Sequence, residues 1–247
     1  MSMNPVAQLT VIAIFIGLAV YLAQDLPKRI VLVINAFAAG TVLFFIISMV
    51  SGVLGRMAEL FQANTFAGGI FANPWVFTVV ALLAIFVSPL VMIFVVGERR
   101  RSVILAVALG LFNLGFALTS SNEVASGILN VTIGPALLLA LIFLLEGLAI
   151  GALLLNARPS WYLVTALGAT TVVPALIGFN MPSLGSLDVF VPFTYAAAAG
   201  FLLFYLPFIL GLNDKNSPND IKWHFIGMLS GLFCTGLIYT AFNLLGR

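Results

Sequence analysis

Residues 131–155 read VTIGPALLLALIFLLEGLAIGALLL, with Glu146 as the one charged residue among them. The run is long enough for a transmembrane helix, which needs about 20 mostly apolar residues. A carboxylate at hydrocarbon depth is costly, and it marks either a functional site or a buried, neutral structural group. We expect the neutral acid, since desolvation disfavours the charged form. No other charged side chain of the sequence lies so far inside an apolar stretch.

The composition of the whole chain is that of a membrane protein. Of the 247 residues 62% are hydrophobic and only 7% are charged, whereas soluble domains carry about 25% charged residues. Because so few charges cannot cover a water-facing surface, the lipid bilayer is the expected surrounding. The length suits a single polytopic domain over residues 1–247. The single Cys234 provides neither a disulfide framework nor a cysteine-based metal cluster.

Seven other stretches have similar length and hydropathy, which predicts an all-α integral membrane protein with eight transmembrane helices. The expected helices cover approximately residues 5–24, 30–55, 75–96, 103–121, 131–155, 161–180, 190–211 and 223–245. Residues 56–74 are expected to form a loop with a short interfacial helix. Because residues 1–8 carry no positive charge, we expect the first helix to be retained rather than cleaved as a leader.

The basic residues predict the orientation. Eight of the ten Lys and Arg residues fall in the loops that follow odd-numbered helices, and the strongest group is Arg99, Arg100 and Arg101. Loops rich in Lys and Arg stay in the cytoplasm. We therefore expect both termini to lie outside the cytoplasm, in the cell membrane (a plasma or bacterial inner membrane).

Two segments of the sequence resemble each other. Residues 36–45 read AFAAGTVLFF and residues 196–205 read AAAAGFLLFY, with six of ten positions identical. The expected topology gives the two helices opposite directions, which is typical of the inverted repeats of secondary transporters. The alternative is chance recurrence of small residues, which let transmembrane helices pack closely.

With these features the chain resembles the ZIP family (Zrt- and Irt-like proteins) of divalent-metal transporters. The resemblance covers nearly the whole chain and rests on residues 35–40, 146–151, 171–178 and 198–200. It implies a 3+2+3 bundle in which helices 1–3 and 6–8 are inverted repeats around helices 4 and 5. It also implies a two-metal site on helices 4 and 5, made of His, Asn and Glu or Asp side chains.

The chain keeps few of the ligands that the resemblance implies. Asn113 and Glu146 occupy ligand positions, and four others carry Phe112, Phe116, Ile142 and Phe143. One amide and one carboxylate fall short of the four donors that Zn²⁺ takes, or the six oxygens of a hard cation. Backbone carbonyls or water could complete a shell only if a helix were broken, for which Gly115 and the Ser120–Ser121 pair are a hint.

Two functions stay open. The first is a divalent metal cation transporter with a degenerate site, in which Asn113 and Glu146 lie at the midpoint of the pathway and Glu146 could also couple proton movement. The second is a non-transporting scaffold or accessory subunit of a larger membrane complex, in which Glu146 forms a structural hydrogen bond between helices 4 and 5. A hydrated cavity that reaches Glu146 would favour the transporter. Close packing of Phe112, Phe116 and Ile142 over Glu146 would favour the scaffold.

The remaining expectations concern partners and chemistry. The sequence has no nucleophile constellation, phosphate loop or redox motif, so we expect neither an enzyme nor a resident cofactor, with a divalent metal as substrate at most. No basic aromatic patch suggests nucleic acid. The expected partners are the lipid bilayer, a divalent cation, and either a second copy in a homodimer or a subunit of a membrane complex.

Overall fold

The computed structural model describes residues 3–23, 26–63, 73–96, 101–129, 132–155, 159–180, 190–209 and 218–246. All regular structure in these ranges is helical. The elements are α1 (Met3–Leu18), a 3₁₀ turn η1 (Ala19–Leu22), α2 (Lys28–Ala63), α3 (Pro74–Val96), α4 (Arg101–Ala125), α5 (Ile133–Leu154), α6 (Trp161–Asn180), α7 (Val191–Ile209) and α8 (Pro218–Gly246). The predicted all-α fold with eight helices is confirmed for the described residues.

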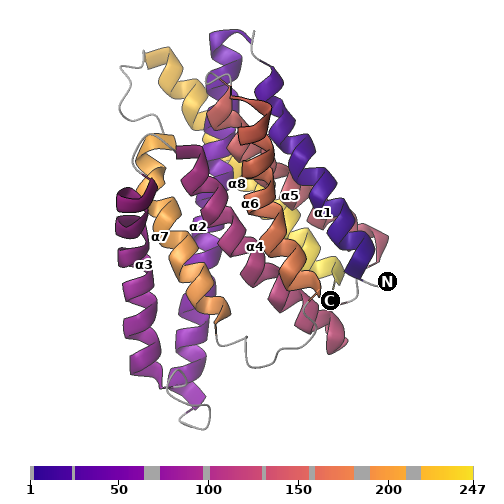
Figure 1. The fold of residues 1–247 in the computed structure, drawn as a ribbon, viewed down its shortest axis with the longest axis vertical. Coiled ribbons are helices and arrows are strands. Elements are labelled where there is room, and N and C mark those ends of the chain that lie inside the picture. The colour runs from indigo at the N-terminus through magenta and orange to yellow at the C-terminus, as the bar shows by residue number, and fades with distance from the viewer. Residues whose placement is uncertain are drawn as a thin grey trace.

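Six of these helices are long and apolar enough to cross a membrane, namely α2, α3, α4, α5, α6 and α8. The other two contribute shorter apolar helices, Val6–Leu22 and Val191–Leu203. Successive helices alternate in direction, so that the marked N- and C-termini lie toward the same end of the bundle (Figure 1). The chain is therefore a multi-pass membrane protein. We call the end that holds both termini the terminal end.

The second helix is longer than the sequence predicted. α2 continues through Arg56 and Glu59 to Ala63, where we expected the chain to leave the helix at residue 55. Arg56 Nη1 donates a 2.8 Å hydrogen bond to Glu59 Oε2, an i,i+3 pair on an exposed face. Residues 56–63 contain no glycine or proline, and most are good helix formers, so nothing in them ends the helix. The middle of the expected loop, residues 64–72, lies outside the described residues.

Helices distant in sequence form the main contacts of the bundle. α2 packs along α8, α3 along α7, α1 along α5, and α4 along α6. α2 also contacts α7, and α1 contacts α6, while α4 packs on α7 and α5 on both α2 and α8. Figure 1 shows α3 and α7 at one side of the bundle and α1 at the other. α4 and α5 touch each other between these groups.

Two glycines at matching places in the repeated segments allow close approaches between helices. A Cβ at Gly40 of α2 would collide with the Met228 carbonyl of α8, and a Cβ at Gly200 of α7 would collide with the Ile85 carbonyl of α3. Small residues at such crossings let two backbones approach within van der Waals contact. The two similar sequence segments therefore have the same packing role, each against a different helix.

Candidate functional site

The two polar residues singled out in the sequence meet at the centre of the bundle. Asn113 of α4 donates a hydrogen bond from Nδ2 to Oε2 of Glu146 on α5, at 2.7 Å. Both side chains have 0% exposed surface. α4 and α5 otherwise make few contacts, so this bond is a main link between them. A hydrogen bond between these two helices is what the structural interpretation of Glu146 predicted.

A third helix joins the pair through its backbone. Asn113 Nδ2 also lies 3.3 Å from the carbonyl oxygen of Thr171 on α6. Sequence reasoning missed this contact, and Pro174 does not point to it. The N–H that is missing at Pro174 leaves the Thr170 carbonyl without its helical donor, whereas the Asn113 amide lies against the carbonyl of the next residue.

Two oxygens of the pair have no partner. Asn113 Oδ1 and Glu146 Oε1 are buried and make no hydrogen bond within the described part of the chain. A buried acceptor without a donor costs about 1–3 kcal/mol. Glu146 therefore lies in a pocket that supplies one amide donor and leaves part of its hydrogen-bonding capacity unused.

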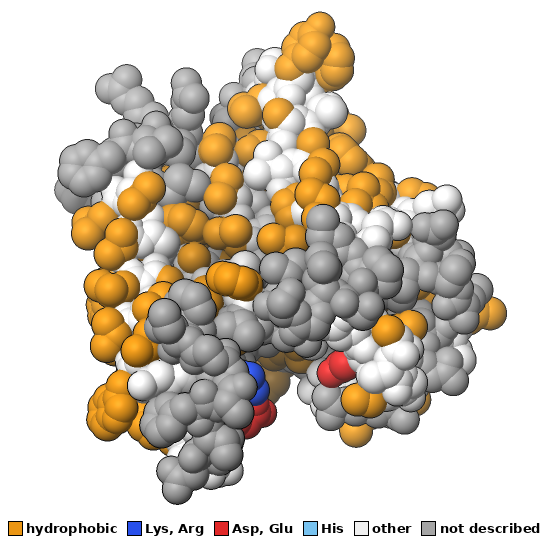
Figure 2. Space-filling model, turned by 60° about the horizontal axis from the view of Figure 1, so that its bottom comes forward, with side chains coloured by type: hydrophobic (Ala, Val, Ile, Leu, Met, Phe, Trp, Pro, Cys, Tyr) orange, Lys and Arg blue, Asp and Glu red, His pale blue; other side chains and the backbone are white. Residues whose placement is uncertain are grey.

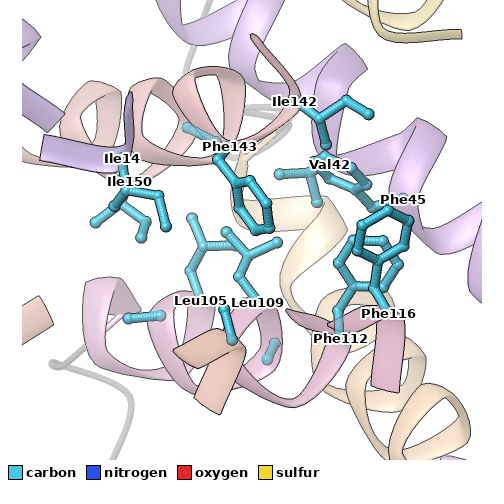
Figure 3. Packing of buried hydrophobic residues seen from close by; sticks show 14 of the residues in the cluster. Ile14, Val42, Phe45, Leu105, Leu109, Phe112, Phe116, Ile142, Phe143 and Ile150 are labelled. Atoms are coloured by element: carbon cyan, nitrogen blue, oxygen red, sulfur yellow. The ribbon is translucent and has the colours of Figure 1, made fainter. Parts of the chain in front are cut away.

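Large apolar side chains within four residues of Asn113 or Glu146 along α4 and α5 are buried with the pair. Phe112 is 2% exposed, Phe116 6%, Ile142 1% and Phe143 0%. The ring centroids of Phe112 and Phe116 are 5.9 Å apart, and those of Phe116 and Phe143 are 6.4 Å apart. Figure 3 shows Phe45, Phe112 and Phe116 grouped together, and Phe143 pointing from α5 toward Leu105 and Leu109 of α4. This is the close packing that we expected of a non-transporting bundle.

The donors around Glu146 do not suit a divalent cation. The described residues contain no group of three or more His, Cys, Asp or Glu side chains that could hold a metal ion. α4 is also continuous from Arg101 to Ala125, so the break suggested by Gly115 and Ser120–Ser121 does not occur. Instead, Gly115 leaves room for Thr194 and Tyr195 of α7, which a Cβ would meet at 2.6 and 2.7 Å.

Two hollows lie away from the pair. One, of about 520 Å³, lies at the terminal end, between the C-terminal parts of α2 and α4 and the first turns of α7. We call it the terminal vestibule. The other, of about 500 Å³, is a groove between α2 and α8 that includes Ser48 and Asn243. Neither Glu146 nor Asn113 lines either hollow, so neither of these two hollows reaches the buried carboxyl.

The proposed topology determinants are only partly described. Arg99 and Arg100 lie outside the described residues, and Arg101 is the first residue of α4. The helices that begin after the basic loops, α2, α4, α6 and α8, all start at the end of the bundle opposite the terminal end (Figure 1). Lys28, Arg29 and Lys222 lie in the first turns of such helices and have exposed side chains.

Comparison of the chain with models of protein families and with curated protein sequences gives no match.

Proposed function

We propose that this protein is a ZIP-like multi-pass membrane protein whose midpoint is closed by aromatic packing, so that it does not carry divalent metal ions along that route. In this proposal the bundle acts as a scaffold or accessory subunit of a larger membrane complex. The observation that carries the proposal is the dense packing of Phe112, Phe116 and Phe143 beside a fully buried Glu146.

The contacts between helices support inverted repeats. Inverted repeats would relate α1 to α6, α2 to α7, α3 to α8 and α4 to α5. When each helix is replaced by its related helix, the contact of α2 with α8 becomes that of α7 with α3. The contact of α1 with α5 likewise becomes that of α6 with α4, and that of α5 with α8 becomes that of α4 with α3. Each exchanged pair also runs in opposite directions (Figure 1). The α5–α8 contact is much more extensive than the α3–α4 contact, and the α2–α3 contact has no counterpart of similar extent.

Close approaches between backbones support a register for this exchange. A Cβ at Gly17 of α1 would meet the Leu144 carbonyl and the Leu148 N–H of α5. A Cβ at Gly178 of α6 would meet the Leu114 carbonyl and the Leu118 N–H of α4. Residue 144 thus corresponds to 114, and 148 to 118. In the same register, the residue that corresponds to Glu146 is Phe116.

In this register Phe116 occupies the position that is equivalent to the acid Glu146. An inverted pair of helices with a shared metal site would place an acid at each of the two equivalent positions, and here one acid is replaced by a phenyl ring. That ring lies 5.9 Å from the Phe242 ring of α8 and 5.9 Å from the Phe112 ring, centroid to centroid. Aromatic side chains packed in this way exclude water from the place where a second carboxylate would hold a cation.

A second candidate function, transport with a degenerate site, is favoured by one observation. Glu146 Oε1 and Asn113 Oδ1 are buried oxygens without a partner, and such oxygens could bind a partly hydrated cation if the packing around them opened. Transport would then require a different arrangement of α4 and α5, because one carboxylate and one amide provide too few donors for a dehydrated divalent ion.

The two functions are separated by metal flux into proteoliposomes. We would measure uptake of Zn²⁺, Mn²⁺, Fe²⁺ and Cd²⁺ by wild-type protein and by Glu146→Gln, with empty liposomes as the baseline. The closed bundle predicts no uptake above that baseline for either protein. Saturable uptake by wild type that Glu146→Gln abolishes would contradict the proposal and establish the second candidate.

A further inference from the structure

The terminal vestibule is a site of its own, apart from the buried Glu146. It opens where α2 and α4 end and α7 begins, at the terminal end of the bundle. Figure 2 looks at this end and shows a basic and an acidic side chain together on one side of a hollow, and an acidic side chain on the other side. Its volume of about 520 Å³ is in the range of pockets that bind small ligands, about 300–1,000 Å³.

The vestibule carries one charge of each sign. Arg56 lines it from α2 and Glu123 lines it from α4. Arg56 is already bonded through Nη1 to Glu59 at 2.8 Å, but a guanidinium has five N–H donors in a planar fork, and the rest of the fork can bind an anion. Glu59 is not among the residues that line the vestibule. In a chain with 7% charged residues, opposite charges at one hollow provide a polar recognition site.

Neutral polar groups complete the lining. Thr119 and Asn122 lie on α4 on the same side as Glu123, Ser126 lies in the turn that follows α4, and Tyr195 lies on α7. Hydroxyl and amide groups both donate and accept hydrogen bonds, so they can orient a ligand that has donors at one end and acceptors at the other. Apolar side chains, such as Val191 and Pro192, form the rest of the wall, which is the usual composition of a small-molecule pocket.

Tyr195 separates the vestibule from the centre of the bundle. Its ring packs close to Gly115 of α4 and Gly52 of α2, where a Cβ would meet ring carbons at 2.7 and 3.4 Å. On its inner side the ring centroid lies 5.7 Å from that of Phe112. Phe112 continues the aromatic packing toward Phe116. A ligand in the vestibule would therefore meet these rings before it reached Glu146.

We propose that the terminal vestibule binds a small zwitterion, with the anionic group of the ligand at Arg56 and its ammonium group at Glu123. Arginine binds carboxylates and phosphates through paired N–H groups, and an ammonium pairs with a carboxylate. A ligand with only one of these charges would pair with only one of the two residues. This binding needs no path through the midpoint, so it holds whether or not the protein transports metal ions.

Phosphoethanolamine is a suitable probe because it holds a phosphate and an ammonium in one small molecule. We would titrate it calorimetrically into the full chain in a nonionic detergent, beside ethanolamine and inorganic phosphate as its two halves. The proposal predicts that phosphoethanolamine binds at least about tenfold more tightly than either half, as expected for one added charge-assisted contact. Equal binding of ethanolamine alone or of phosphate alone would overturn it, and so would the absence of binding by all three.

Substitutions test the two charges separately. Arg56→Gln and Glu123→Gln should each weaken phosphoethanolamine binding about tenfold or more. Glu59→Gln, which removes the neighbouring acid outside the vestibule, should leave binding intact or strengthen it. If either single substitution unfolds the protein, the double exchange Arg56→Glu with Glu123→Arg decides, because a zwitterion can bind in the reversed direction. Wild-type affinity in both single variants, or no binding in a folded double exchange, would overturn the proposal.

A phosphate and an ammonium group occur together both in free solutes and in lipid headgroups. Nanodiscs of phosphatidylglycerol alone, compared with nanodiscs that also contain phosphatidylethanolamine, distinguish these sources. If the vestibule takes a lipid headgroup, phosphatidylethanolamine will compete with soluble phosphoethanolamine. If it takes a free solute, the affinity will be equal in both nanodiscs. Both results retain the zwitterion site and assign the source of its ligand.

Discussion

Asn113 Nδ2 donates to Glu146 Oε2 at 2.7 Å, and neither side chain has any exposed surface. The bond joins α4 to α5, and the same amide reaches the Thr171 carbonyl of α6. A polar link among three helices in an apolar interior has few competing partners. It fixes one relative position of these helices, whereas apolar packing alone tolerates small shifts.

The link predicts unequal effects of two substitutions. Asn113→Ala should lower the free energy of unfolding by about 2 kcal/mol, because it leaves the buried Glu146 without its donor. Glu146→Gln keeps an acceptor oxygen at the same place and should cost less than about 1 kcal/mol. Reversible unfolding in mixed detergent micelles measures both values. An equal or larger loss for Glu146→Gln would show that the bond is not the main role of the carboxyl.

We expect that the bundle does not tolerate a methyl group at Gly40 or at Gly200. Gly40→Ala and Gly200→Ala should each destabilise the protein by about 1–3 kcal/mol, because the new Cβ would overlap a backbone carbonyl of α8 or α3. Gly55→Ala is the matched control, since it lies in the same helix as Gly40 with nothing within 4 Å of its Cβ position. Thermal unfolding should leave the control unchanged or raise its unfolding temperature, as alanine favours helix. Equal tolerance at all three positions would mean that the helices do not approach so closely.

The register that sets Phe116 against Glu146 predicts a gain of metal binding. Phe112→His combined with Phe116→Glu should make a Zn²⁺ site with Asn113 and Glu146, because it supplies an imidazole and a second carboxylate. Micromolar Zn²⁺ should then raise the unfolding temperature of this double variant and leave that of wild type unchanged. The same double variant with Glu146→Gln is the control and should lose the effect. A double variant that folds but does not respond to Zn²⁺ would argue against this register.

The basic loops predict the orientation in the membrane. In a Cys234→Ser background, Ser126→Cys at the terminal end should react with a membrane-impermeant maleimide added to intact cells. Lys28→Cys at the opposite end should react only after the cells are permeabilised, because the loops rich in Lys and Arg face the cytoplasm. Both original side chains are exposed. The reverse pattern would place both termini in the cytoplasm.

Hydropathy located all eight helices because each apolar run is long and bounded by polar residues. It ends α2 too early, at residue 55, because charged residues such as Arg56 and Glu59 are typical of loops, although one helical turn pairs these two. The contact of Asn113 with Glu146 followed from the register of two motifs. The Thr171 carbonyl could not be predicted, because every residue has a carbonyl and only the packing of α4 on α6 brings this one to Asn113.

The terminal vestibule could not be predicted either. Arg56 and Glu123 are far apart in sequence, and both were expected in connecting segments rather than inside α2 and α4. Their approach depends on how far each helix extends beyond its apolar run and on how α7 packs between them. Neither property has a periodic signal in the sequence.

The closed midpoint is tested most directly by the access of water-soluble reagents to position 113. Asn113→Cys and Ser126→Cys, each in a Cys234→Ser background, would be reconstituted in liposomes and treated from either side with a small charged methanethiosulfonate reagent. Our account predicts rapid modification at position 126 from one side and none at position 113 from either side during the same time. Modification at position 113 from one side in folded protein would contradict it, because the midpoint would then lie on a path for water and ions.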